Sequence, residues 1–219
     1  MASETNKDEA PPQELFFRIS GTGEGHWETE RPQPVIVKLV QQGFFYGKLL
    51  DIGCGIGDNT IYIAKHTSNV SITATDLVPK AIEVAREKAQ KANVNILFEV
   101  VDMIADLSTT NLKQNSYDVI LDAAVFHVFS NKDRLVYIKN LESLIKPNGL
   151  YIQLCFSEKE TRQGGPPRVK KSDLYQLFSS KNGWTIESIE DAIYESTSAG
   201  PLGLDGRAYL SLIRRDKSV

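Results

Sequence analysis

Cysteine and histidine are scarce in this chain of 219 residues, which contains two cysteines and three histidines. Cys54 and Cys155 lie far apart in apolar, strand-like sequence, which indicates reduced thiols and excludes a disulfide scaffold. His26, His66 and His127 share no spacing typical of metal ligands, so we expect no metal site.

Long apolar runs are also missing. No run approaches the length of about 18 residues that crosses a bilayer, so we expect no membrane partner. Residues 1–13 are polar and include Glu4, Asp8 and Glu9. A polar, acidic start without an apolar centre is unlike a secretory or mitochondrial targeting segment, and it predicts a cytoplasmic protein.

Basic residues do not exceed acidic ones, since 25 Lys and Arg stand against 28 Asp and Glu, giving a net charge of −3. Proteins that bind nucleic acid usually carry a basic excess or a basic stripe. The basic clusters here, at 168–171 and 214–215, are short. We therefore expect a small-molecule partner, no nucleic acid and a monomer. With 41% apolar and 24% charged residues, the composition is that of an ordinary globular domain.

Short strand-like segments alternate with segments of helical periodicity after about residue 30. Strands are expected near 48–52, 71–76, 95–101, 117–122, 150–156, 184–194 and 207–214, and helices near 32–42, 58–66, 79–92, 130–145 and 172–180. This alternation predicts a mostly parallel sheet covered on both faces. The last two strands have no helix between them, so one of them must be antiparallel. We expect an α/β fold with one doubly wound, mostly parallel, seven-stranded sheet and an antiparallel last strand.

Local patterns refine these elements. Asp58 is expected to cap its helix, and Ser130 with Asp133 resembles a capping box. One helix face is expected to bury Ala81, Ile82, Ala85 and Ala89, and another to bury Leu135, Ile138, Leu141, Leu144 and Ile145. Residues 16–27 are rich in aromatics and glycine but have no period. We therefore divide the chain into a flexible tail and active-site cover, 1–30, and a single domain, 31–219.

The strongest chemical signal is a glycine loop, Asp51-x-Gly-x-Gly-x-Gly57, between a strand and a helix. Such a loop lets the backbone approach a ligand closely at the sheet edge where open α/β folds bind ligands. Asp76 ends the next strand, where a carboxylate accepts hydrogen bonds from ribose hydroxyls. The loop departs from the G-x-G-x-x-G dinucleotide pattern, and Asp51 and Asp58 would repel a pyrophosphate. A nucleoside with a positive end, S-adenosylmethionine, suits this charge better.

In this arrangement the chain resembles the class I S-adenosylmethionine-dependent methyltransferases. The motifs that carry the resemblance span about residues 45–156, and they are Leu50–Gly57, Thr75–Leu77, Val101–Met103, Tyr117–Asp122 and Leu144–Gly149. The resemblance implies the fold expected above, S-adenosylmethionine as the cofactor and S-adenosylhomocysteine as its product.

The resemblance also implies roles for single residues. Asp51 would contact the methionyl end together with Gly53, Gly55 and Gly57, and Asp76 would hold the ribose. The remaining members of the expected cofactor set are Trp27, Asn59, Leu77, Asp102, Met103, Asp122 and Ala123. Asp102 and Met103 would flank the adenine, whereas Asp122 and Ala123 would border the site of methyl transfer. Asp122 has a second interpretation as a cap of the loop after its strand.

Three segments outside this core resemble the thiopurine and thiocyanate (thiol or halide) methyltransferases and their bacterial relatives. These segments are Trp27–Pro34, Leu121–His127 and Gly164–Pro167. Glu30 occupies a position where that group usually has glycine, and Arg168 occupies one where the thiocyanate enzymes have tyrosine. These departures leave the identity of the acceptor open.

The predicted acceptor is a small thiol or another soft nucleophile. The sequence Asp122-Ala-Ala-Val125 lacks the [DN]-P-P-[YFW] pattern of enzymes that methylate exocyclic amines of bases or protein glutamine. The expected pocket is formed by Phe16, Phe17, Phe126 and Arg168. A thiol is partly ionised near neutral pH and needs no strong base, and His127 is the one evident candidate for a base. Two alternatives remain, an O- or N-methyltransferase of a small metabolite and a non-catalytic protein that binds S-adenosylmethionine. A short-chain dehydrogenase is disfavoured because no Tyr-x-x-x-Lys is present.

Overall fold

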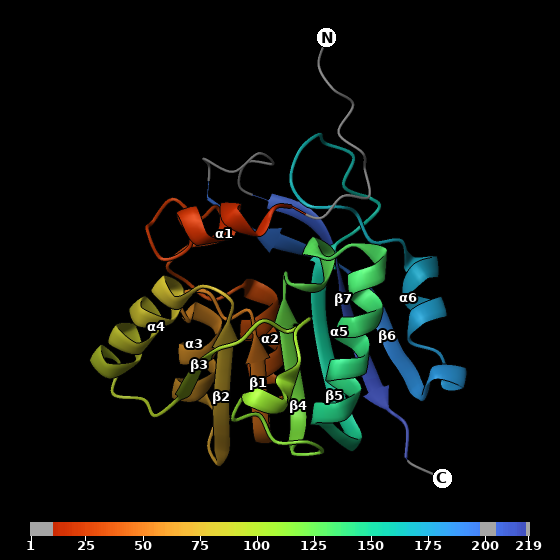
Figure 1. Cartoon of the computed structure of the whole chain (residues 1–219), viewed down its shortest axis with the longest axis horizontal. Coiled ribbons are helices and arrows are strands. Elements are labelled where there is room, and N and C mark those ends of the chain that lie inside the picture. Colours follow the sequence, from red (N-terminus) through yellow and green to blue (C-terminus); the bar gives the residue numbers. More distant parts are fainter. Residues whose placement is uncertain (1–10, 198–204, 218–219) are drawn as a thin grey trace.

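The computed structural model describes residues 11–197 and 205–217. The first ten residues of the expected tail and most of the segment between the last two strands lie outside this part of the chain. A seven-stranded sheet forms the centre of the molecule, in the order β3-β2-β1-β4-β5-β7-β6 (Figure 1). Its strands are β1 Gly47–Ile52, β2 Val70–Asp76, β3 Leu97–Val100, β4 Tyr117–Ala123, β5 Ile145–Phe156, β6 Trp184–Glu195 and β7 Asp205–Arg215.

The direction of the strands confirms the predicted fold class. β1 to β5 pair in parallel, whereas β7 is antiparallel to both of its neighbours, β5 and β6. The helices are α1 Gln13–Ile19, α2 Pro34–Gln41, α3 Asp58–His66, α4 Pro79–Lys91, α5 Asn131–Leu144 and α6 Lys171–Leu177, with short 3₁₀ helices η1 Leu107–Thr109, η2 Phe126–Val128 and η3 Ser180–Asn182. Among the described residues, none of the helices is long and apolar enough to cross a membrane.

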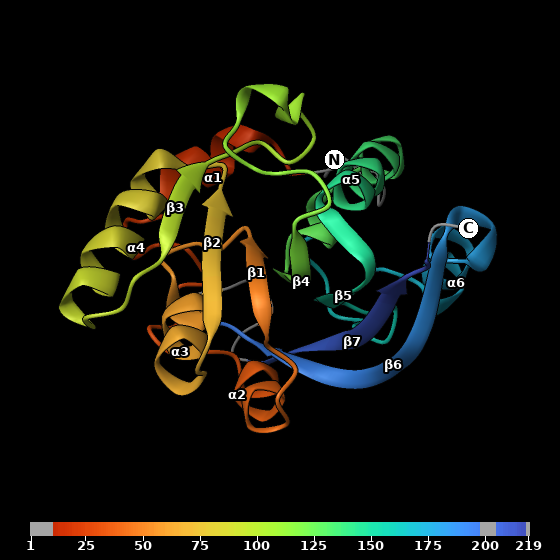
Figure 2. The ribbon, with the colours of Figure 1, turned by 90° about the horizontal axis from the view of Figure 1, so that it is seen from below.

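Successive residues of the central strands enter two different apolar clusters, because side chains alternate across a strand. In β1, Leu49 packs in the cluster that contains residues of α2 and α3, whereas Leu50 packs in the cluster that contains residues of α5 and α6. Figure 2 shows α2 and α3 on one side of the sheet and α5 on the other. Helices therefore cover both faces, and the carboxyl ends of the parallel strands remain available for a site.

Two helices show how far periodicity predicts burial. In α4, the expected residues Ala81, Ile82, Ala85 and Ala89 are all buried, as predicted. In α5 the capping prediction is confirmed, since the Ser130 hydroxyl accepts the Asp133 N–H at 3.2 Å. The prediction that Leu135 is buried is wrong.

Leu135 is 60% exposed because the buried stripe of α5 runs through Arg134, Tyr137 and Leu141. Leu135 is rotated about 100° from this stripe. Arg134 belongs to the buried stripe because its guanidinium lies over the Phe126 ring, 5.0 Å from the centroid.

Two predictions about helix starts need correction. Gly57, in the left-handed conformation at φ 85°, is the N-cap of α3, and Asp58 is already its first helical residue. Asp58 forms an ion pair with Lys88 of α4 instead of capping the helix. In the segment expected to be irregular, residues Gln13–Ile19 form α1. Seven residues are too few for a helical period to stand out in the sequence.

Candidate active site

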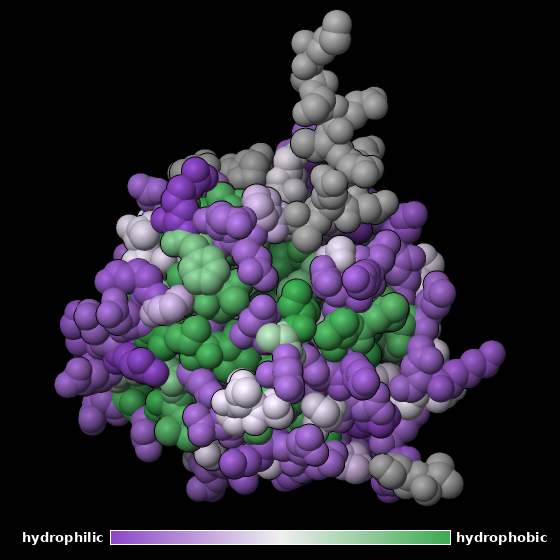
Figure 3. Space-filling view, in the orientation of Figure 1, coloured by the Kyte–Doolittle hydropathy of each residue, from purple (hydrophilic) through white to green (hydrophobic). Residues whose placement is uncertain are grey.

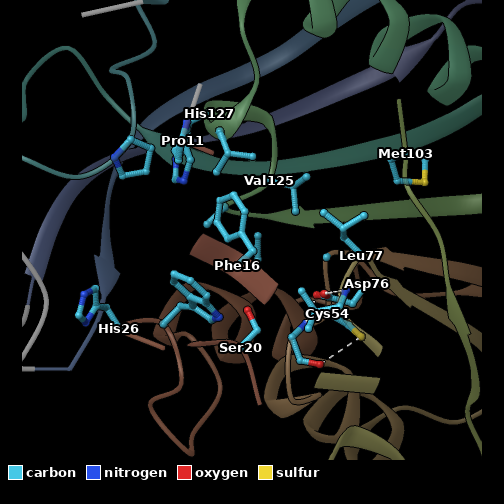
Figure 4. A pocket seen from close by; sticks show the side chains of 18 of the residues that line it. Pro11, Phe16, Ser20, His26, Cys54, Asp76, Leu77, Met103, Val125 and His127 are labelled. Carbon is cyan, nitrogen blue, oxygen red and sulfur yellow. Dashed lines mark hydrogen bonds between the residues drawn. The ribbon is translucent and has the colours of Figure 1, made fainter. Parts of the chain in front are cut away.

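A cavity of about 510 Å³ opens at the carboxyl ends of the parallel strands. Its walls come from the loops after β1 to β4, from the ends of β5 and β6, and from the segment that includes α1. In the view of Figure 3, apolar side chains gather near the centre of the visible surface, below α1. Figure 4 shows the Phe16 ring of α1 facing Val125 and His127 across the cavity. The volume is large enough for a nucleoside and a small second molecule.

The glycine loop forms one wall of this cavity. Gly53 and Gly55 line it with positive φ angles of 64° and 55°. A Cβ on Gly53 would lie 2.1 Å from a methyl carbon of Val125, so only glycine fits there. The Trp27 indole covers the loop, since a Cβ on Gly55 would lie 3.8 Å from its Cδ1 atom. Gly57 is buried below the wall, where it caps α3.

Asp76 lines the cavity beside the glycine loop. One carboxylate oxygen accepts the Gly55 N–H at 2.8 Å, and the other accepts the Val78 N–H at 2.9 Å. Each oxygen keeps a second lone pair for a ligand, and the residue lines the cavity. Burial raises the pKa of this carboxyl, although the backbone N–H bonds oppose the shift. The carboxylate therefore both fixes the glycine loop and is available to accept hydrogen bonds from a diol.

The residues expected to flank the adenine, Asp102 and Met103, also line the cavity, as does Leu77 of the expected cofactor set. Asp102 accepts the Ile104 N–H at 3.0 Å, which orients its carboxylate at the end of β3. Met103 is almost fully buried and adds an apolar surface. Asn59 also lines the cavity, and its side-chain oxygen accepts the Gln33 N–H at 2.8 Å.

Asp51 does not line the cavity, in contrast to the expected contact with the methionyl end. Its carboxylate is buried below the glycine loop and accepts the Thr60 hydroxyl. The pKa of Asp51 is raised to about 7, chiefly by burial and also by the nearby carboxylates of Asp122 and Asp76, while the Thr60 bond opposes the shift. Asp51 can therefore affect a cationic ligand through its charge, without touching it.

Asp122 needs a similar correction, because the cap interpretation describes it better than a border of the methyl-transfer site. The side chain is fully buried. Its oxygens accept the N–H groups of Val125 at 2.8 Å and Phe126 at 3.1 Å. They also accept the hydroxyls of Tyr137 at 2.7 Å and Tyr151 at 2.8 Å. By accepting these four hydrogen bonds, the Asp122 carboxylate holds η2 against the sheet.

The residue next to Asp122, Ala123, does line the cavity. Gly53 and Val125 reach the cavity close by, so the end of β4 meets the glycine loop at this point.

His127 lines the cavity with a defined tautomer. Its Nδ1 accepts the Phe156 N–H at 2.9 Å, so the proton of the neutral ring must be on Nε2. The ring stacks on Phe156 with centroids 4.8 Å apart. Burial lowers the pKa of His127 to about 3, and the positive charges of Arg134 and Arg168 lower it as well. The imidazole is therefore a neutral hydrogen-bond donor, a state that does not suit the general base considered from the sequence.

The expected substrate pocket is only partly assembled. Phe16 lines the cavity and packs against Trp27, with ring centroids 5.8 Å apart. Phe17, on the next position of α1, is 50% exposed and points away. Phe126 is fully buried in the core, where it packs against Tyr137 and Phe178.

Arg168 also lies outside the cavity wall. Its guanidinium donates to the carbonyls of Glu160 at 3.1 Å, Arg162 at 2.9 Å and Gly164 at 2.8 Å. This single side chain therefore organises the loop after β5. The loop itself supplies Gly165 and Pro166 to the cavity.

Several cavity residues were not selected from the sequence. Gln33 ties the start of α2 to the end of β6, because its side chain accepts the Glu195 N–H at 2.8 Å and donates to the Glu195 carbonyl at 2.9 Å. Glu28, which does not itself line the cavity, accepts the N–H groups of Gly21 and Gly23 and so shapes the turn after α1. Both residues lie in the segment Trp27–Pro34. Its resemblance to known enzymes indicated a functional region but did not predict these hydrogen bonds. His26, Phe156 and Tyr194 line the acceptor side, and nothing in the sequence distinguished them.

Comparison with known proteins agrees with this geometry. Residues 49–149 match a family described as a methyltransferase domain. The chain is 30% identical over 171 residues to the 2-heptyl-1-hydroxyquinolin-4(1H)-one methyltransferase of Mycobacteroides abscessus. This alignment covers 76% of this chain and 71% of that protein. The chain belongs to the S-adenosylmethionine-dependent methyltransferases.

Other known proteins are similar to this methyltransferase in sequence or in fold. It is 29% identical over 166 residues to a probable thiol methyltransferase 2 of Arabidopsis thaliana, covering 75% of this chain and 71% of that one. A solved structure that concerns conversion of a disulfide bond into a thioacetal group during echinomycin biosynthesis is 28% identical, with a TM-score of 0.79 over 94% of this chain and 93% of that one. A methyltransferase of Methanosarcina mazei, 17% identical, shares the fold with a TM-score of 0.66, over 86% of this chain and 100% of that one.

S-adenosylmethionine is the cofactor of this methyltransferase, and the residues present fit it. The carboxylates of Asp76 and Asp102 lie on the cavity wall where a ribose and an adenine need acceptors. Gly53 and Gly55 allow close approach of the backbone beside them. No group of His, Cys, Asp and Glu in the described ranges 11–197 and 205–217 has the arrangement of a metal site.

Proposed function

We propose that the methyltransferase methylates a small thiol, or another soft nucleophile, that enters the cavity as an anion. The observation that carries this proposal is the state of His127, whose Nδ1 is occupied by the Phe156 N–H. The ring therefore offers the cavity an N–H donor and has no free lone pair with which to take a proton. Such a donor stabilises an acceptor that is already ionised.

The carboxylates on the cavity wall have other partners. Asp58 pairs with Lys88, and Asp133 accepts the Ser130 hydroxyl at 2.6 Å. Asp76 and Asp102 accept backbone N–H groups and are assigned to the cofactor. Because these groups are committed elsewhere, an acceptor that needs no deprotonation fits the site best. A thiol with a pKa near 8.5 is partly a thiolate at neutral pH.

Each part of the cofactor site has a distinct task in this proposal. Asp76 binds the two ribose hydroxyls, and Leu77, Asp102 and Met103 hold the adenine. Gly53, Gly55, Asn59 and Ala123 receive the methionyl end, and Trp27 covers it. The bound cofactor supplies a methyl group on a positively charged sulfur. The chain aligns the acceptor with that methyl group at about 3 Å.

Methyl transfer then requires no further reagent. With the cofactor bound, the acceptor sulfur would form the new carbon–sulfur bond with a lone pair while the methyl–sulfonium bond broke, which would leave S-adenosylhomocysteine and a thioether. Phe16 and Trp27 exclude water from this region, which favours a step in which opposite charges are neutralised. We further propose that residues 1–30, which carry both side chains, act as a cover that closes over the bound molecules.

The test is an acceptor panel in which release of S-adenosylhomocysteine is measured for thiols, thiocyanate, iodide, phenols and amines. We expect aromatic thiols to give the highest kcat/KM and amines to give none that is measurable. Turnover of amines or alcohols with no turnover of any thiol would refute the proposed S-methylation.

A second candidate is O-methylation of an acidic aromatic or heteroaromatic hydroxyl. The acceptor named for the Mycobacteroides abscessus relative carries such a hydroxyl on nitrogen. In this chain, His26 lines the cavity, and its buried Nδ1 has no hydrogen-bond partner among the described residues. An imidazole in that position could take a proton from a hydroxyl. Loss of phenol turnover in His26→Gln, with thiol turnover unchanged, would favour this candidate.

A further inference from the structure

Tyr194 presents a polar group to the cavity that has no partner in the described part of the chain. The residue is 7% exposed and lines the cavity near the end of β6. Its hydroxyl makes no hydrogen bond with a described residue, and burial is the one cause that raises its pKa. A phenolic hydroxyl in the cavity can donate a hydrogen bond to a ligand. A ligand that accepts a hydrogen bond from Tyr194 would therefore be favoured over one that does not.

Tyr194 and His127 both pack against the ring of Phe156. Phe156 stacks with His127 at 4.8 Å and an interplanar angle of 19°. It meets Tyr194 edge-on at 5.5 Å and 88°. The centres of the His127 and Tyr194 rings are therefore no further apart than these two distances combined. Both side chains line the cavity, so their donor groups belong to one part of its wall.

The end of β6 is held in place, so the position of Tyr194 is defined before a ligand binds. The next residue, Glu195, is bound on both sides of its backbone by the Gln33 side chain. Its carboxylate forms an ion pair with Arg31 at 2.9 Å. Two residues further on, the Thr197 N–H donates to the His26 carbonyl at 2.8 Å. A preorganised donor loses little conformational entropy when it binds a ligand.

The other side of the acceptor region is apolar. Phe16 and Trp27 cover it from the N-terminal segment, and Val125, Val128 and Phe129 line it from the region of η2. The region thus offers apolar contacts to a flat ligand body, and His127 and Tyr194 offer hydrogen bonds to a polar edge. The region therefore suits a ligand that has an apolar body and a polar edge.

We propose that Tyr194 and His127 form a two-donor site that selects a flat aromatic thiolate with a second hydrogen-bond acceptor on the neighbouring ring position. One donor binds the anionic sulfur and the other binds the neighbouring atom. Tyr194 is then a specificity-determining residue of the methyltransferase. This inference rests on the proposed S-methylation and names the substrate class for the same site.

The experiment compares two isomers of equal size, 2-methoxybenzenethiol and 4-methoxybenzenethiol, because only the first has an acceptor atom beside the sulfur. Their binding to the protein saturated with S-adenosylhomocysteine is measured by calorimetry, which does not depend on turnover. The wild type is expected to bind the 2-methoxy isomer about tenfold more tightly. Tyr194→Phe, which removes only the hydroxyl, is expected to abolish this preference.

A matched control is Tyr62→Phe, which makes the same change on α3, where Tyr62 stacks on His66 away from the cavity wall. It should keep the tenfold preference, and both variants should bind S-adenosylhomocysteine as the wild type does. A wild type without the preference, or a preference that survives in Tyr194→Phe, would overturn the inference. If the preference appears and depends on Tyr194 but neither isomer is methylated, the two-donor site stands and the proposed S-methylation fails.

Discussion

Replacing Asp76 by alanine tests the cofactor site most directly. The carboxylate is assigned to both ribose hydroxyls, and it also accepts the N–H groups of Gly55 and Val78. Loss of hydrogen bonds to a charged group that is shielded from water weakens binding by about 2–3 kcal/mol, or roughly 30- to 150-fold in Kd. Loss of the two backbone bonds should also lower the free energy of unfolding by about 1–3 kcal/mol, because both N–H groups lose their acceptor.

The assay is calorimetric titration with S-adenosylmethionine and S-adenosylhomocysteine, together with thermal melting of each variant. Asp106→Ala is the control, since Asp106 caps η1 on the surface, away from the cavity. It should leave both Kd values unchanged. Asp76→Asn keeps one acceptor oxygen and should fall between the wild type and Asp76→Ala. If Asp76→Ala melts at a lower temperature but binds both nucleosides normally, Asp76 serves the glycine loop alone and the ribose assignment is wrong.

Three further predictions concern pH and the N-terminal segment. His127, with its pKa lowered to about 3 from 6.5, binds fewer protons folded than unfolded between these values. The free energy of unfolding should therefore fall by up to ~5 kcal/mol as the pH drops through that window, and less so in His127→Gln. Because His127 does not titrate near neutrality, kcat/KM should show no ionisation near pH 6.5 that depends on it, and finding one would contradict its role as a donor. Asp51, with its pKa raised from 3.8 to about 7, binds more protons folded than unfolded, so its contribution to stability should fall as the pH rises through that range. Chemical denaturation should show Asp51→Asn gaining stability relative to the wild type between pH 5 and pH 8, and no gain would refute the shift. A chain that begins at Pro32 should remain folded but lose at least about tenfold in kcat/KM, because Phe16 and Trp27 no longer exclude water. Full activity in a truncated chain with a normal melting temperature would exclude the proposed cover.

The sequence alone determined the features that depend on local pattern. Alternating apolar strands and amphipathic helices determined the sheet and its coverage, because the periods of 2 and 3.6 residues belong to the backbone itself. The position of the glycine loop after β1, and of Asp76 at the end of β2, followed from chain order. Parallel strands bring their carboxyl ends to one edge, so these residues had to meet there.

Only the tertiary structure decided which way side chains point where no period holds. Phe16 and Phe17 are neighbours in α1, yet one lines the cavity and the other is exposed. Asp122 looked like a site residue, but hydroxyls from α5 and β5 converge on its carboxylate and give it a structural role.

The acceptor side depends on contacts between segments that lie far apart in the chain. Tyr194 reaches the cavity because Gln33, over 160 residues earlier, holds the end of β6. His127 is a donor because the backbone of β5 occupies its other nitrogen. A hydrogen bond of this kind is set by the packing of whole elements, and no short sequence pattern contains it. The sequence therefore determined the fold and the position of the glycine loop and Asp76 at one edge of the sheet, whereas packing decided which side chains line the cavity and what state they are in.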